Sequence, residues 1–150
     1  KIDKLAKEGT PNIQLPKTHF DNLAFSVSGI KTAIINLHHK NPDINKADLC
    51  ASFEENVTQV LLDNVLKAAE QLNINKIALA GGVSANSYIR EKFNELEKTH
   101  GLKIYYPEPI LCTDNAAMIA SAGYYNYING KKSDLYLNAI PNLKLGEECQ

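Results

Sequence analysis

Residues 77–90 of the sequence, IALAGGVSANSYIR, combine a predicted buried strand with two glycines and a helix start. Gly81 and Gly82 can adopt positive φ and let a ligand approach the backbone, while the amides at a helix start favour an anion. The side-chain amide of Asn86 can both donate and accept at this point, which suits a ribose or a phosphate. A tight strand-to-helix turn in which Asn86 caps the helix explains the same residues. Taken alone, the segment leaves both interpretations open.

Residues 111–120, LCTDNAAMIA, place Thr113 and Asp114 at the start of a helix of small residues. Either residue can cap that helix, and capping is the commonest role of an Asp in this position. The alternative for Asp114 is a metal or phosphate ligand, because open α/β folds place their sites at the carboxyl ends of strands. Transition-metal sites usually take three or more protein ligands. The other ligands of a metal would therefore have to come from elsewhere.

Residues 25–32, FSVSGIKT, bring serines, a glycine and a lysine to another helix start. The segment is not a GxxxxGK[ST] phosphate-binding loop, so we expect a structural turn there. His38 and His39 end a short predicted helix and are expected to face solvent rather than a metal. Since no Ser/His/Asp arrangement with a credible base stands out, the catalytic residues are left unknown.

The elements that must position these segments alternate between helix and strand. We expect helices at residues 1–9, 31–39, 46–72, 84–99 and 114–129, and strands at residues 23–27, 77–80 and 102–106. Alternation at these lengths favours an α/β fold in which the three strands share one sheet with parallel neighbours. Gly81, Gly82, Asn86 and Asp114 are then expected together at the carboxyl edge of that sheet.

Local signals mark the ends of the predicted helices. Asn45 is a good N-cap for the long helix, Ser84 or Asn86 caps the next one, and Gly101 is placed for its C-terminal turn. The long helix carries one apolar stripe, which we expect to be buried: Leu49, Phe53, Val57, Val60, Leu61, Leu66 and Ala69.

Composition narrows the class of protein. The chain has 150 residues, 44% of them hydrophobic, and a formal charge of -1 from 16 Lys plus Arg against 17 Asp plus Glu. This balance excludes the strongly basic surface of a stand-alone nucleic-acid binder. No apolar stretch approaches the roughly 20 residues that span a bilayer, so we expect a cytoplasmic protein with no membrane partner. Cys50, Cys112 and Cys149 form no CxxC pair, which supports neither a disulfide framework nor a zinc knuckle.

Three motifs in order, FSVSGIKTA, IALAGGVSANSYIR and LCTDNAAMIASAGY, closely resemble the TsaD family, the catalytic subunit of the tRNA adenosine threonylcarbamoyltransferase. The usual family forms are FSFSGLKT, AGGVAAN and CTDNGAMIA. This chain departs from them mildly, at Val27, Ile30, Ser84 and Ala116. The resemblance covers residues 1–125, and three co-ordered motifs are far more specific than any one of them.

The resemblance implies a ribonuclease H-like lobe of the actin, sugar-kinase and Hsp70 (ASKHA) class. It implies that the whole chain, residues 1–150, is the C-terminal lobe of a two-lobe protein whose N-terminal lobe is absent here. Asn86 with Gly81 and Gly82 would contact the substrate nucleotide. Asp3, at the end of what looks like a GGPxID motif, would contact the ribose hydroxyls. Asp114 would share one divalent metal ion, iron by family resemblance or zinc, with an HxxxH pair in the absent lobe.

The activity implied by the resemblance is transfer of threonylcarbamoyl from threonylcarbamoyl-AMP to N6 of the adenosine beside the anticodon, in tRNAs reading codons that start with A. Implied partners are tRNA and, in bacteria, a related inactive subunit and a small ATPase. We expect the lobe alone to be inactive. The alternatives are an ATP-dependent sugar or acid kinase lobe of the same fold class, which CTDNAAMIA argues against, and a non-catalytic interaction module. A metalloprotease has no support, because these residues contain no HxxxH pair.

Overall fold

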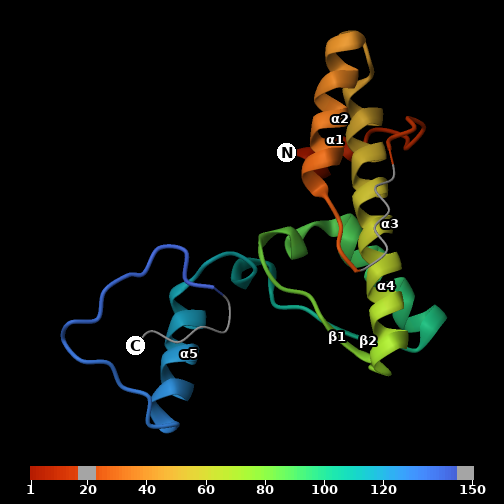
Figure 1. Cartoon of the computed structure of the whole chain (residues 1–150). Helices are drawn as coiled ribbons and strands as arrows, with labels where there is room; N and C mark the ends of the chain where they lie inside the picture. Colours follow the sequence, from red (N-terminus) through yellow and green to blue (C-terminus); the bar gives the residue numbers. More distant parts are fainter. Residues whose placement is uncertain (17–22, 145–150) are drawn as a thin grey trace. The chain divides into compact units, whose positions relative to one another are not determined.

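The computed structural model describes residues 1–16 and 23–144 and divides the chain into two units, Lys1–Thr113 and Asp114–Gln150. Residues 17–22 and 145–150, among them Cys149, lie outside the described residues. The elements of the first unit are α1 (Ile2–Ala6), α2 (Val27–Lys40), α3 (Lys46–Leu72), β1 (Lys76–Ala78), the 3-10 helix η1 (Gly82–Ala85), α4 (Ser87–His100), β2 (Lys103–Tyr105) and the 3-10 helix η2 (Pro109–Leu111). The second unit contains α5 (Ala116–Ile128) (Figure 1).

The central element of the first unit is α3, because α1, α2 and α4 all contact it (Figure 1). Its start is the predicted one: the Asn45 side chain accepts hydrogen bonds from the backbone amides of Ala47 at 2.9 Å and Asp48 at 3.4 Å. The helix ends at Asn73, which takes the left-handed conformation with φ 51°. The predicted bounds of this helix, residues 46–72, are therefore confirmed.

The sheet has two strands among the described residues. β1 and β2 pair in parallel, with Ile77 opposite Ile104. The predicted strand at residues 23–27, and with it the three-stranded sheet, was wrong. Ser26 instead caps α2, since its hydroxyl oxygen accepts from the backbone amide of Gly29 at 3.2 Å. That cap lets the helix begin at Val27, four residues before the predicted start at Lys31.

The apolar core of the first unit lies between α3, α4 and the sheet. Phe93 of α4 is only 1% exposed and packs with Leu62 and Ala69 of α3 and with Leu102. Burying a side chain of this size stabilises the fold by about 1.5–3 kcal/mol. Of the two predicted caps for α4, Asn86 is the N-cap, so the helix begins at Ser87 rather than at residue 84, and Gly101 follows it in the left-handed conformation.

The N-terminal half of α3 buries polar side chains where an apolar stripe was expected. Of the predicted stripe only Leu49 and Ala69 are buried. Four polar residues of the same helix are buried as well: Ser52, Glu54, Asn56 and Thr58. A polar face of this kind is costly unless other elements supply hydrogen bonds. It marks the region where α1 and α4 meet α3.

The last helix, α5, begins two residues later than predicted. Asn115 is its N-cap and accepts from the backbone amide of Met118 at 3.0 Å. The prediction that Thr113 or Asp114 caps this helix was therefore wrong. Across the described ranges, no helix combines the length and the apolar character needed to cross a membrane.

Candidate functional site

The chain leaving α1 is held tightly on α3. A side chain at Gly9 would overlap the backbone carbonyl group of Ala47, so only glycine allows this approach. The backbone amide of Thr10 donates to the Asp48 carboxylate at 2.8 Å, and that of Ile13 donates to Ser52 Oγ at 3.0 Å. These contacts fix α1 beside the first half of α3.

This placement brings α1 to the start of α4. The Ser87 hydroxyl donates to Asp3 Oδ1 at 2.6 Å, a contact between residues 84 positions apart in the sequence. Lys7 Nζ lies 3.8 Å from Asp3 Oδ2. Asp3 and Asn86, two of the predicted substrate contacts, thus lie at the same helix N-terminus, since Asn86 immediately precedes Ser87.

Asn86 uses both ends of its side-chain amide. Its Oδ1 accepts from the backbone amide of Ile89 at 2.9 Å, which is the helix-cap contact. Its Nδ2 donates to Glu54 Oε1 at 2.7 Å. The capping interpretation of Asn86 is therefore confirmed, and the amide is also held by a carboxylate from α3. This second contact fixes the amide plane at the edge of the site.

Glu54 is the site residue that the sequence analysis missed. It is only 7% exposed and lies one helical turn from Ala51 and Thr58 on the buried face of α3. Burial raises the pKa of Glu54, the hydrogen bond from Asn86 opposes this, and the negative charge of Asp3 adds to it. A glutamate at helical spacing between small and polar buried residues was the available signal. The predicted apolar stripe runs through Phe53 and therefore assigned Glu54 to a different face of the helix.

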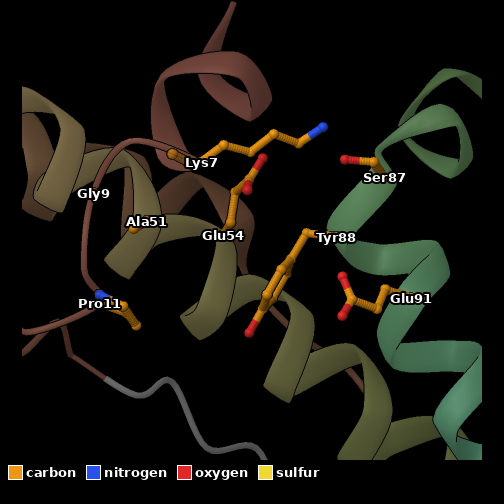
Figure 2. Close-up of a pocket in the computed structure, with 9 residues that line it drawn as sticks. Lys7, Gly9, Pro11, Ala51, Glu54, Ser87, Tyr88 and Glu91 are labelled. Carbon is orange, nitrogen blue, oxygen red and sulfur yellow. The ribbon is translucent and has the colours of Figure 1, made fainter.

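A cavity of about 230 Å³ lies between these elements. Figure 2 shows Lys7 from the end of α1 and Glu54 from α3 on one side, and Ser87, Tyr88 and Glu91 from α4 on the other. The hydroxyl of Tyr88 donates to Glu55, which ties α4 to α3. The cavity combines hydroxyl-accepting carboxylates, one ammonium group and an aromatic wall. Such a lining suits a polar ring or a sugar with several hydroxyl groups.

Residues 81–86, which we call the glycine loop, connect β1 to α4. Gly81 has φ 84°, which L side chains rarely adopt, and a side chain there would meet no atom within 4 Å. The loop is closed by Ser84, whose backbone amide and hydroxyl both donate to the Gly81 carbonyl, at 3.0 and 2.7 Å. The loop thus turns at a position that favours glycine, and its backbone there is open to a ligand.

A second cavity of about 510 Å³ borders the glycine loop, at Ala80 and Val83, and shares Glu54 and Asn86 with the site. Its walls are mostly apolar. The hydroxyl of Thr58, a residue 2% exposed, faces no hydrogen-bond partner there. Glu54 lines both cavities, and Asn86 lines the second.

Asp114 follows Thr113 and is exposed. Because Asn115 caps α5, the carboxylate of Asp114 is not needed as a helix cap. Within the part of the chain that the structure describes, no three His, Cys, Asp or Glu side chains come together as a metal site. Asp114 begins the second unit, so its predicted position beside Gly81 and Gly82 stays a prediction.

Residues 1–121 match the family model of TsaD, tRNA N6-adenosine threonylcarbamoyltransferase. This chain belongs to the TsaD family. Relatives named tRNA N6-adenosine threonylcarbamoyltransferase include those of Clostridium novyi (strain NT), 50% identical over 155 residues, and Clostridium kluyveri (strain NBRC 12016), 51% identical over 155 residues. Each alignment covers 98% of this chain and 46% of the relative. The chain therefore spans about half the length of the TsaD relatives it matches.

One solved structure shares the fold at low sequence identity. HypF of T. kodakarensis superposes with a TM-score of 0.62 at 17% identity, over 87% of this chain and 17% of its own. At this identity the likeness extends to the fold alone, which combines helices and a sheet. The family assignment of this TsaD chain rests on the sequence match.

Proposed function

We propose that this chain is the C-terminal, ASKHA-class lobe of a tRNA N6-adenosine threonylcarbamoyltransferase, and that it binds the nucleotide of threonylcarbamoyl-AMP. The family match supports the activity. The observation that carries the binding role is the meeting of Asp3 with Ser87 and of Asn86 with Glu54 at the N-terminus of α4, beside the glycine loop. Three helices distant in sequence, α1, α3 and α4, converge there on one small cavity.

The residues of the lobe would bind and orient the donor. The Asp3 carboxylate, already accepting from Ser87, can accept from ribose hydroxyls as well, because each carboxylate oxygen takes more than one hydrogen bond. Backbone amides of the glycine loop and of the N-terminus of α4 would bind the phosphate, because a helix start favours an anion. Asn86, whose side-chain amide is held by Glu54, would also contact the nucleotide. Holding the donor in one geometry is the main contribution expected of such a site.

Asp114 would supply one oxygen ligand to a divalent metal, iron by family resemblance with zinc as the alternative. An exposed carboxylate that its helix does not use as a cap fits this role. A bound metal would act as a Lewis acid on the carbamoyl carbonyl. The described residues assemble no three-ligand group, so the remaining ligands would come from outside this chain.

The acceptor and the partners follow from the same assignment. The formal charge of -1 supports a division of the tRNA surface between this lobe, the other lobe and partner subunits. In a bacterium these partners would be a related inactive subunit and a small ATPase, and the reaction would occur in the cytoplasm. This lobe alone would not transfer the group.

The test uses the full-length protein with its partner subunits and measures threonylcarbamoyl-AMP binding by calorimetry and transfer to tRNA. Asn86→Ser keeps a side chain that caps α4 but lacks the amide that Glu54 holds. We expect this variant and Asp3→Asn to weaken nucleotide binding about tenfold or more, which is about 1.4 kcal/mol or more. Asp43→Asn, an exposed carboxylate between α2 and α3, is the matched control. Unchanged binding in both site variants would overturn the nucleotide assignment.

A further inference from the structure

Arg90 is the one arginine in a sequence that contains fifteen lysines. It lies in the first turn of α4, half-buried, and its backbone amide donates to the carbonyl of the N-cap Asn86. None of the contacts described so far uses its side chain. Among the described residues, no carboxylate lies within ion-pairing distance of its guanidinium.

The guanidinium of Arg90 instead contacts three backbone or thiol groups and one ring. Nε donates to the Ser84 carbonyl at 2.6 Å, and Nη2 donates to the Pro107 carbonyl at 2.8 Å. Nη2 also lies 3.1 Å from Cys112 Sγ, and the guanidinium stacks 4.5 Å from the centre of the Tyr106 ring. A single side chain thus joins two separate loops.

These loops are the glycine loop and residues 107–113, which we call the β2 loop. β1 and β2 are parallel neighbours, so both loops leave the sheet from the same edge. Cys112 is 4% exposed, and its thiol also faces the Glu108 carbonyl at 3.5 Å. A side chain at Gly82 would lie 3.6 Å from the Thr113 methyl group, so the loops approach each other closely. Arg90 closes this contact from the α4 side.

The geometry requires arginine rather than lysine. The planar guanidinium presents several N–H donors in a fixed fork and stacks on an aromatic ring, whereas the lysine ammonium is a compact charge on a flexible stem. Arg90 reaches Ser84 through Nε and Pro107 through Nη2 while its plane covers the Tyr106 ring. An ammonium group donates from a single nitrogen and has no plane that can stack on the Tyr106 ring.

We propose that Arg90 is a positioning residue that locks the glycine loop to the β2 loop. In doing so it fixes Cys112 and Thr113, the two residues that lead directly to Asp114. The link to catalysis rests on the proposed function, in which the glycine loop holds the nucleotide and Asp114 contributes to the metal site. Without the contacts of the Arg90 guanidinium the two loops move separately. Threonylcarbamoyl-AMP then still binds but is held in the wrong geometry.

The test compares Arg90→Lys and Arg90→Met with Lys98→Met in the full-length protein. Lys98 is an exposed cation in the last turn of the same helix, whereas Arg90 lies in the first. Two quantities are measured: the kcat and KM of transfer to tRNA, and the rate at which iodoacetamide labels Cys112, read by mass spectrometry with Cys50 as the internal reference. The kinetic constants require the transfer reaction. The labelling rate of Cys112 reports whether the two loops are closed together, and it does not require the reaction.

For Arg90→Lys we expect kcat to fall about tenfold to a hundredfold, the cost of misplacing reacting groups by an ångström or less, with KM for tRNA little changed. Cys112 labelling should rise severalfold, while Lys98→Met matches the wild-type protein in both measurements. Arg90→Lys keeps the charge and most of the side chain, so the test survives if Arg90→Met does not fold.

If iodoacetamide labels Cys112 in Arg90→Lys at the wild-type rate, the proposal that Arg90 locks the two loops together is overturned. Faster labelling with unchanged kcat would reduce Arg90 to a structural role and would also overturn the proposal. If the wild-type protein transfers nothing to tRNA, the proposed function fails instead, and the lock is then decided by Cys112 labelling alone.

Discussion

Glu54 shows how a single buried acid can serve a site and cost stability at the same time. Its carboxylate holds Asn86 at 2.7 Å, and burial raises its pKa above the ordinary value of 4.5. An acid with a raised pKa binds more protons in the folded than in the unfolded protein. The free energy of unfolding therefore falls as pH rises from the unfolded pKa through the folded one, and it stays lower above that window.

Glu54→Gln should remove this loss, because a glutamine oxygen can still accept from Asn86 but never ionises. We expect the variant to gain stability relative to the wild-type protein as pH rises from about 4 to about 8, measured by denaturant unfolding at several pH values. Glu70→Gln, an exposed glutamate on the same helix, is the control. Parallel stability curves for Glu54→Gln and the wild-type protein would contradict the prediction.

The thiol of Cys50 provides a second readout of the same charge. Burial raises the pKa of Cys50, and the negative charge of Glu54 raises it further. Glu54→Gln should therefore lower that pKa and speed alkylation of Cys50 at mildly alkaline pH, since the thiolate is the reacting form. An alkylation rate equal to that of the wild-type protein would mean that Glu54 carries no charge there.

At the scale of elements, the site depends on how closely α1 packs on α3. Gly9→Ala places a methyl group onto the Ala47 carbonyl, and backbone on both sides leaves no flexible atom to yield. We expect a loss of about 1–3 kcal/mol in unfolding free energy together with weaker nucleotide binding, because α1 carries Asp3 to Ser87. Calorimetry and denaturant unfolding measure the two effects.

Gly123→Ala is the matched control for Gly9→Ala. This glycine lies inside α5, and a side chain there would meet nothing within 4 Å. Replacing it should stabilise its helix by roughly 0.5–1 kcal/mol and leave nucleotide binding unchanged. If Gly9→Ala behaves in the same way as Gly123→Ala, the packing of α1 on α3 does not position Asp3.

The elements that could be predicted from the sequence were those with local end signals. Asn45 and Asn86 cap α3 and α4 through backbone amides two or three residues away, and Gly101 follows α4 in the left-handed conformation, as predicted. The strand at residues 23–27 failed because a short apolar run becomes a strand only where a neighbour pairs with it, while Ser26 offers a local cap. Glu54 was missed for a related reason: only the tertiary contacts with α1 and α4 make its burial tolerable.

At the scale of the whole molecule, the chain spans about half the length of the relatives it matches. We expect residues 1–150 alone to transfer no threonylcarbamoyl group to tRNA, even with partner subunits present, whereas the full-length protein does. The assay is incorporation of labelled threonine into tRNA. Transfer by the isolated chain at the full-length rate would show that its own residues complete the reaction site.

Asp114 is the residue of this chain that we propose as a metal ligand in the complete protein. Because Asn115 already caps α5, Asp114→Asn should leave the helix start intact while removing one negative ligand. In the full-length protein we expect strongly reduced iron or zinc by elemental analysis and a matching loss of transfer.

Asn115→Ala provides the opposite case for the same helix start. It removes the helix cap at a cost of about 1 kcal/mol but should retain the metal. Comparing the thermal midpoints of the two metal-stripped variants separates a loss of ligand from a loss of helix stability. If Asp114→Asn keeps wild-type metal content and transfer rate, Asp114 is not a metal ligand, and its carboxylate serves neither the metal nor the cap of α5.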